Sequence, residues 1–182
     1  MPKLPPELHQ MLAQIDAPLA DRVSVAPMPP LGAGRRQDDL CDYLDSQLRV
    51  GSLNKAPQTM ASQTNTSLPL DSLLWLLAGD LDRSHDISQR LHTADGSLLH
   101  GIMHRREGDF SNAKYWFAKA PHHDVPKTLA KRFEDYGSAA QFVDTCEAAW
   151  DGGRQDDAVA RCLEIQWAEW CLLAERLLNA EK

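Results

Sequence analysis

The stretch from Ser97 to Pro126 reads S-L-L-H-G-I-M-H-R-R-E-G-D-F-S-N-A-K-Y-W-F-A-K-A-P-H-H-D-V-P. Its pattern predicts a helical hairpin, with one helix before Gly108 and a second after Asp109 that ends at Pro121. One side of the first helix carries apolar residues at helical spacing, namely Leu98, Leu99, Ile102 and Met103. The inner stripe of the second helix consists of Ala113, Phe117 and Ala120. We expect the fold to form around this hairpin.

Polar residues occupy a different side of the first helix. His100, His104 and Glu107 recur at steps of four and three, so they share one face of that helix. This dense set of hydrogen-bonding side chains indicates a site, but it does not identify a reaction.

Helical patterns continue on both sides of the hairpin. The sequence predicts helices over about 6–15, 38–51, 71–78, 81–91, 126–136 and 138–150, and a long final helix that reaches about residue 179. The run L-L-W-L-L at 73–77 is apolar on nearly every side, which predicts a central, buried helix. Residues 17–34 are rich in Pro and Gly and are expected to be irregular. Residues 92–97 are expected to form a turn.

The Ser-, Thr-, Asn- and Gln-rich segment 52–69 is expected to be a long loop, and Gly152 and Gly153 to break the chain. No segment shows convincing strand alternation, so we expect an all-α fold of antiparallel helical hairpins or a bundle. Residues 1–69 would form N-terminal helices and an irregular connection that pack on an all-α core domain, 70–182. The final helix has a second apolar row, which is buried either within the domain or in a homodimer.

Composition and charge narrow the classes of partner. The chain has 182 residues, a normal size for one buried core, and a net charge of -7. This acidic balance argues against binding to nucleic acid or to an anionic membrane surface. No apolar run is long enough for a membrane span, and the N-terminus lacks a secretory signal pattern, so a cytoplasmic location is the default expectation. The cysteines have no C-x-x-C spacing, and we expect reduced thiols.

Two resemblances follow from these residues. The positions of the small and aromatic packing residues in the hairpin, Gly101, Gly108, Ala113, Phe117 and Ala120, resemble the inner half of a tetratricopeptide or Sel1-type hairpin. A bundle of antiparallel hairpins is the alternative, because any tight helix–turn–helix favours glycine at the turn and alanine at the contact.

The span from Leu81 to Phe117 also resembles a family of uncharacterised, mainly bacterial proteins. The signature of that family reads D-x-S-H-x-I-S-Q, followed by H-G-I-M-H-R-R-E-x-D-F-S-N-A-K-Y-W-F, and this chain matches it at 82–89 and through nearly all of 100–117. The resemblance implies membership of a family and carries no activity with it.

Antiparallel packing of 82–91 against 98–107 would place residues equally far from the turn at equal height. That pairs His85 with His104, Gln89 with His100, and Asp82 with Glu107. Imidazoles and carboxylates that converge between two helices are typical of a helical-bundle metal site, with His85, His100 and His104 as candidate ligands of a divalent metal. They are equally typical of proton transfer, with His85, His104 and Glu107 as candidate catalytic residues.

Neighbouring residues suggest further roles. Arg105 and Arg106 could hold an anionic group through bidentate hydrogen bonds, or they could belong to a salt-bridge network that stabilises the hairpin. The full set of candidate substrate-binding residues is Gln89, Arg105, Arg106, Asp109, Asn112, Lys114 and Tyr115. Trp116 is expected in the core, and His122 and His123 are expected at the surface.

Two functions from different classes therefore remain open. The first is a helical binding or scaffolding module, in which the polar residues fix the hairpin or contact a protein partner. The second is a small-molecule enzyme, with or without a metal, in which His85 and His104 act as acid and base or as ligands. In that enzyme Arg105 or Arg106 would hold an anionic substrate group. A solvent-reachable site with unsatisfied polar groups would favour the second reading.

Overall fold

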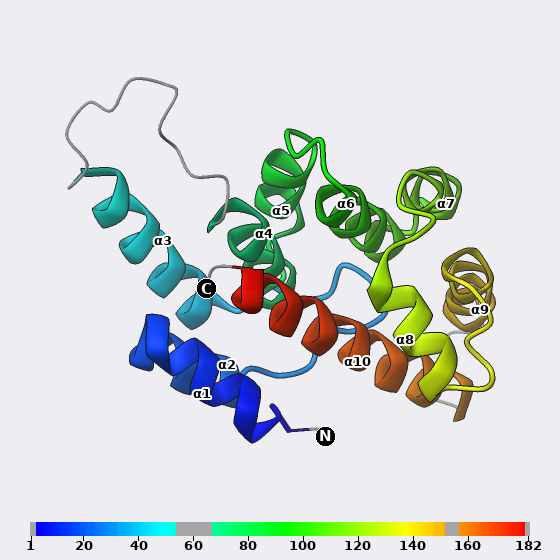
Figure 1. The fold of residues 1–182 in the computed structure, drawn as a ribbon, viewed down its shortest axis with the longest axis horizontal. Coiled ribbons are helices and arrows are strands. Elements are labelled where there is room, and N and C mark those ends of the chain that lie inside the picture. The colour runs from blue at the N-terminus through cyan, green and yellow to red at the C-terminus, as the bar shows by residue number, and fades with distance from the viewer. Residues whose placement is uncertain (1–2, 54–66, 152–156, 181–182) are drawn as a thin grey trace.

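The computed structural model describes residues 3–53, 67–151 and 157–180. Within these ranges the chain forms ten helices and no strand (Figure 1), so the predicted all-α class is confirmed. The helices are α1 (Pro6–Ile15), α2 (Ala17–Val25), α3 (Asp38–Leu53), α4 (Ser67–Ala78), α5 (Leu81–Ser88), α6 (Ala94–Glu107), α7 (Phe110–Ala118), α8 (Asp124–Arg132), α9 (Ala139–Asp151) and α10 (Asp157–Ala180).

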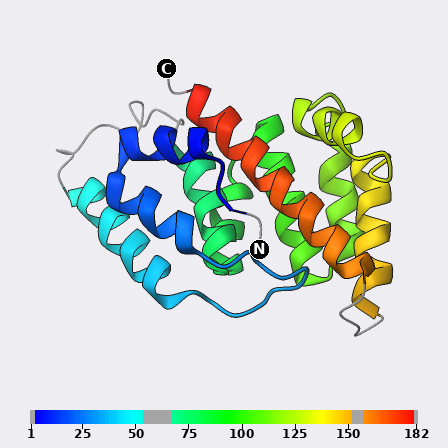
Figure 2. The same cartoon turned by 90° about the horizontal axis from the view of Figure 1, so that it is seen from below.

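The long helix α10 runs along the molecule and connects its two ends (Figure 1, Figure 2). Helix α10 contacts α1, α4, α8 and α9. Helices α4 to α7 pack against one another in sequence, and α9 packs on α7. The apolar rows of α10, including Trp167 and Trp170, are buried within the single chain. The second row therefore has no need of a homodimer to cover it.

Two helices form the centre of the molecule. Every residue from Ser72 to Ala78 of α4 is buried, as the continuous apolar run predicted. Every residue from Gly96 to Arg106 of α6 is also buried, although this stretch includes histidines and arginines. Because buried polar groups are normally hydrogen-bonded, we expect most polar side chains of α6 to find partners within the fold.

The predicted hairpin is present as α6 and α7. Gly108 ends α6 in the left-handed conformation with φ 85°, which glycine adopts without strain. The Asp109 side chain then caps α7 by accepting a hydrogen bond from the Asn112 backbone N–H at 3.2 Å. At Gly101, a Cβ atom would lie 3.0 Å from the ring of Phe117, so the two helices approach closely there.

The C-terminal end of α4 is held by the N-terminal part of the chain. The amide nitrogen of the Gln37 side chain donates to the Leu77 carbonyl at 2.8 Å, and the Gln37 backbone N–H donates to the Ala78 carbonyl at 2.8 Å. From α10, Gln166 donates to the carbonyls of Pro29 and Pro30 at 3.1 Å. These bonds fix the irregular segment that precedes α3 against the helical body.

The prediction that 17–34 is irregular is wrong for its first half, because Ala17–Val25 forms α2. The Asp16 side chain accepts a hydrogen bond from the Leu19 backbone N–H at 2.9 Å and caps this helix. Pro18 lies in the first turn, where its missing N–H has no partner to lose. The proline therefore supports the start of a helix here.

Several predicted boundaries also differ. Helix α5 ends at Ser88 rather than Leu91, and α6 begins at Ala94 because Thr93 caps it, which shortens the turn predicted at 92–97. Helix α7 ends before Pro121, and α8 begins before Pro126. In the predicted loop 52–69, residues 52–53 belong to α3 and residues 67–69 belong to α4. Residues 54–66 lie outside the described residues, as does the predicted break at 152–153. None of the described helices is both long and apolar enough to cross a membrane.

Candidate functional site

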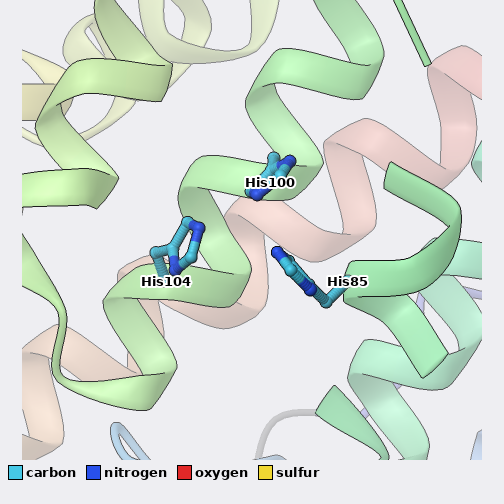
Figure 3. A group of neighbouring side chains, drawn as sticks. All are labelled: His85, His100 and His104. Carbon is cyan, nitrogen blue, oxygen red and sulfur yellow. The ribbon is translucent and has the colours of Figure 1, made fainter. Parts of the chain in front are cut away.

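Three histidine rings from α5 and α6 face one another and are called here the His cluster: His85, His100 and His104. One ring nitrogen from each lies within 4.8 Å of the other two. The His85 ring centroid is 4.8 Å from that of His100 and 5.4 Å from that of His104. Figure 3 shows His85 reaching from α5 toward the two rings of α6.

The spacing of the histidines and the caps of α5 and α6 determine where these rings lie. Residues 100 and 104 are about one helical turn apart, so they lie on the same face of α6. The two rings are stacked with centroids 4.7 Å apart. Asp80 caps α5 through the Arg83 backbone N–H, and Thr93 caps α6 through that of Gly96, so each helix begins at a defined residue.

The pairing predicted across the two helices is present for His85 and His104. His85 lies close to His104 as expected, but it also contacts His100, the residue that Gln89 was expected to face. Gln89 follows the end of α5 and is exposed, with its amide donating to the Asp86 carboxylate at 3.2 Å. Asp82 is exposed as well. The structure therefore places neither Gln89 nor Asp82 in the His cluster.

His104 is held in one tautomer by two side chains. Its Nδ1 lies 3.0 Å from Oε2 of Glu107, and its Nε2 lies 3.0 Å from the amide nitrogen Nδ2 of Asn112. A carboxylate accepts and an amide NH₂ donates, so Nδ1 carries the proton and Nε2 presents its lone pair. A carboxylate on the outer nitrogen of a histidine is the usual second partner of a metal-binding imidazole.

His100 is the most buried member of the cluster, with 3 % of its surface exposed. Its Nδ1 is buried and has no hydrogen-bond partner. Burial, and then the proximity of His104, His85 and Lys119, lower the pKa of His100 to about 4. The ring is therefore neutral at neutral pH. A neutral imidazole with an unpartnered buried nitrogen is costly unless a ligand satisfies it.

Trp116 covers the His cluster on the side of α7. Its ring stacks on His100 with centroids 4.0 Å apart and an interplanar angle of 11°. The residue is half-buried rather than part of the core, and the Lys119 ammonium lies 4.1 Å from its ring centroid. Trp116 was expected in the core, and no local pattern indicated that its ring would stack on His100.

Arg105 and Arg106 do not line the His cluster, which overturns the expectation that they hold a substrate there. Arg105 is 1 % exposed and forms an ion pair with the buried Glu169 of α10. Arg106 is 2 % exposed and donates hydrogen bonds to the backbone carbonyls of Leu76 and Ala33. Burial, and then the charge of Arg105, lower the pKa of Arg106 to about 10. Both arginines join α6 to other parts of the fold.

The remaining predicted residues lie around the α6–α7 turn or on the outside of α7. Asp109 caps α7, and hydrogen bonding from the Asn112 backbone lowers the pKa of its carboxyl group. Lys114 forms an ion pair with Asp144 of α9. Tyr115 is 56 % exposed, with the ammonium of Lys119 4.4 Å from its ring centroid. Of the predicted substrate-binding set, Asn112 is the residue whose side chain lies within hydrogen-bond distance of the ring of a cluster histidine.

His123 was expected at the surface, but its side chain is fully buried. Its Nε2 lies 2.8 Å from the Asp95 carboxylate of α6, and its Nδ1 accepts a hydrogen bond from the Val125 backbone N–H. Arg176 of α10 also donates to Asp95 at 2.7 Å. This network joins α6, α8 and α10 and lies outside the His cluster.

Comparisons of the chain with protein-family models, with curated proteins and with solved structures each returned no match.

Proposed function

We propose that this chain is a helical metal-binding protein whose site is the His cluster. The observation that carries the proposal is the approach of three imidazole nitrogens to within 4.8 Å of one another, with a buried, unpartnered nitrogen among the three rings. Buried imidazoles are normally hydrogen-bonded, and an ion would supply the missing partner. The proposal favours the binding-protein reading and makes a metal ion the ligand.

The donor set favours a late first-row divalent ion. Imidazole nitrogen binds Zn²⁺, Co²⁺, Ni²⁺ and Cu²⁺ well, whereas Mg²⁺ and Ca²⁺ prefer oxygen ligands. The cluster contains no cysteine, so it lacks the thiolates that select softer ions. The low pKa of His100 suits a ligand, because the metal binds the neutral ring. Glu107 would orient His104 from the outer nitrogen.

Metal binding requires the rings to move closer together. Zinc–imidazole bonds are about 2.0–2.1 Å long, so tetrahedral ligands lie about 3.4 Å apart. The ligand nitrogens are separated by up to 4.8 Å, and the stacked rings of His100 and His104 must turn to direct two nitrogens at one ion. These are side-chain rotations, and the helix backbones can remain in place.

The enzyme hypothesis with Arg105 or Arg106 as the substrate holder finds no support in the structure, because both guanidinium groups are buried against other partners. No reaction is assigned to the site.

The test is the metal content of untagged protein purified without chelator, followed by a Zn²⁺ titration against a competing chromophoric chelator. We expect about one ion per chain, and loss of that site in His85→Ala/His104→Ala. The matched control is His92→Ala/His122→Ala, which removes two exposed histidines outside the cluster. Failure of the wild-type protein to compete with the chelator, or equal binding by the two double variants, would contradict the proposal.

A further inference from the structure

We propose that the side-chain oxygen of Asn112 is the fourth protein ligand, which closes the coordination shell; this inference rests on the proposed metal site. The starting point is the contact between Asn112 and His104. The Asn112 amide nitrogen lies 3.0 Å from Nε2 of His104, on the lone pair that a metal ion would use. An ion about 2 Å from Nε2 cannot bind while the amide nitrogen keeps that position.

Rotation about both side-chain torsions of Asn112 resolves this conflict. One torsion moves the amide off the Nε2 lone pair, because any atom left in the place of Nδ2 would lie about 1 Å from the ion. The other torsion turns Oδ1 toward the ion. The oxygen has lone pairs to direct at the ion, and the nitrogen has none. In the metal-free protein the same side chain donates to Nε2 of His104, and in the metal-bound protein the ion would take that lone pair instead. Asn112 therefore competes with the metal in one orientation and binds it in the other.

The backbone keeps Asn112 beside the site. Its N–H donates to the Asp109 carboxylate at 3.2 Å in the first turn of α7, and α7 packs against α6. The side chain is half-buried, and its β-carbon stays near His104 whichever way the amide turns. The neighbouring Glu107 is less well placed, because its carboxylate contacts Nδ1, the other nitrogen of the same ring.

A fourth protein ligand would make this a structural metal site and not a catalytic one. Structural zinc sites are closed by four protein ligands, whereas catalytic sites keep one position open for water or substrate. With Asn112 bound, helices α5, α6 and α7 would all contribute ligands to one ion. The site would then join these helices and exclude small anions from the metal.

The experiment uses Co²⁺ as the probe, because its visible spectrum reports both binding and coordination geometry. Full-length wild-type protein, Asn112→Ala and Asn112→Asp are titrated with Co²⁺, and each Co²⁺ form is then titrated with azide. The matched control is Asn179→Ala, which removes an exposed asparagine from α10. Circular dichroism and a melting curve establish that each variant is folded.

We expect wild-type protein and Asn179→Ala to give an intense tetrahedral Co²⁺ spectrum that azide leaves unchanged. Asn112→Ala should bind Co²⁺ about tenfold or more weakly, and azide should shift its spectrum by taking the open position. Asn112→Asp keeps an oxygen at the same place and should restore both tight binding and resistance to azide. A wild-type spectrum that azide shifts, or unchanged or tighter Co²⁺ binding by Asn112→Ala, would overturn the role of Asn112 alone. Absence of Co²⁺ binding by wild-type protein would overturn the metal site itself.

Discussion

The guanidinium of Arg105 on α6 donates two hydrogen bonds to the carboxylate of Glu169 on α10, and each side chain is only 1 % exposed. The ring of Phe142 lies beside the same guanidinium, with its centroid 4.7 Å away. Burial opposes the charge of Arg105, but the Glu169 carboxylate and other neighbouring groups outweigh it and raise the pKa of the arginine. Helices α6 and α10 are thus joined by a fully buried ion pair.

Removal of one partner from this pair should be strongly destabilising. In Arg105→Met the Glu169 carboxylate remains buried without its cation, and we expect the free energy of unfolding to fall by about 3–5 kcal/mol. Arg105→Met/Glu169→Met removes both charges and should recover much of that loss. Urea denaturation of the wild type, Arg105→Met, Glu169→Met and the double variant measures the difference. Additive losses in the double variant would show that the pair does not act as a unit.

The close approach of α6 and α7 predicts a cost for a methyl group at Gly101. A Cβ there would lie 3.0 Å from two carbons of the Phe117 ring, which is 5 % exposed and tightly packed. Alanine normally stabilises a helix by about 0.5–1 kcal/mol relative to glycine, but overpacking costs about 1–3 kcal/mol. We therefore expect Gly101→Ala to lower stability, and Phe117→Leu to relieve part of the effect. A melting temperature that rises in Gly101→Ala would contradict this packing.

Two adjacent histidines provide a matched comparison of burial. His123 is buried and bonded to Asp95, whereas His122 is exposed. His123→Ala leaves Asp95 and the Val125 N–H without this partner, so we expect a loss of about 1–3 kcal/mol in unfolding free energy. His122→Ala should change it by less than about 0.5 kcal/mol. Equal effects of the two substitutions in chemical denaturation would contradict the role of His123.

The contact between Tyr43 and Asp16 should lose its contribution to folding stability at alkaline pH. Burial, and then a hydrogen bond to Asp16, raise the pKa of the Tyr43 phenol from 10.0 to about 12. The neutral phenol is favoured in the folded state, so its contribution is complete below about pH 10 and is lost as the pH rises toward about 12. Melting curves between pH 9 and pH 12 should fall less steeply for Tyr43→Phe than for the wild type. Parallel curves for the two proteins would contradict this linkage.

The sequence predicted most of the helical architecture, since hydrophobic periodicity and helix-stop residues are local signals. The α6–α7 hairpin, the buried α4 and the long α10 all follow from such patterns. Helix α2 was missed because the prolines and glycines of 17–34 suggested an irregular segment, although Pro18 and the Asp16 cap are compatible with a helix start. Local patterns indicate that a helix forms, but they define its ends less well.

The candidate site was predictable only in part. The spacing of His100 and His104 places them on one face of α6, and pairing α5 with α6 brought in His85. The sequence could not show that Arg105 and Arg106 are buried, because their partners lie 64 residues away on α10 and 30 residues away on α4. His123 was misread for the same reason, since its partner Asp95 is 28 residues distant. Long-range partners decide whether a charged residue lies in the core or at the surface.

The most direct test of the His cluster as a metal centre is X-ray absorption spectroscopy at the zinc edge of the Zn²⁺-loaded protein. We expect three imidazole nitrogens and one oxygen at about 2.0–2.1 Å from the zinc, with the multiple-scattering features of histidine rings and no sulfur. These features should be absent from His85→Ala/His104→Ala prepared in the same way. A sulfur shell at about 2.3 Å, a shell made only of oxygen, or protein that retains no zinc would contradict the account.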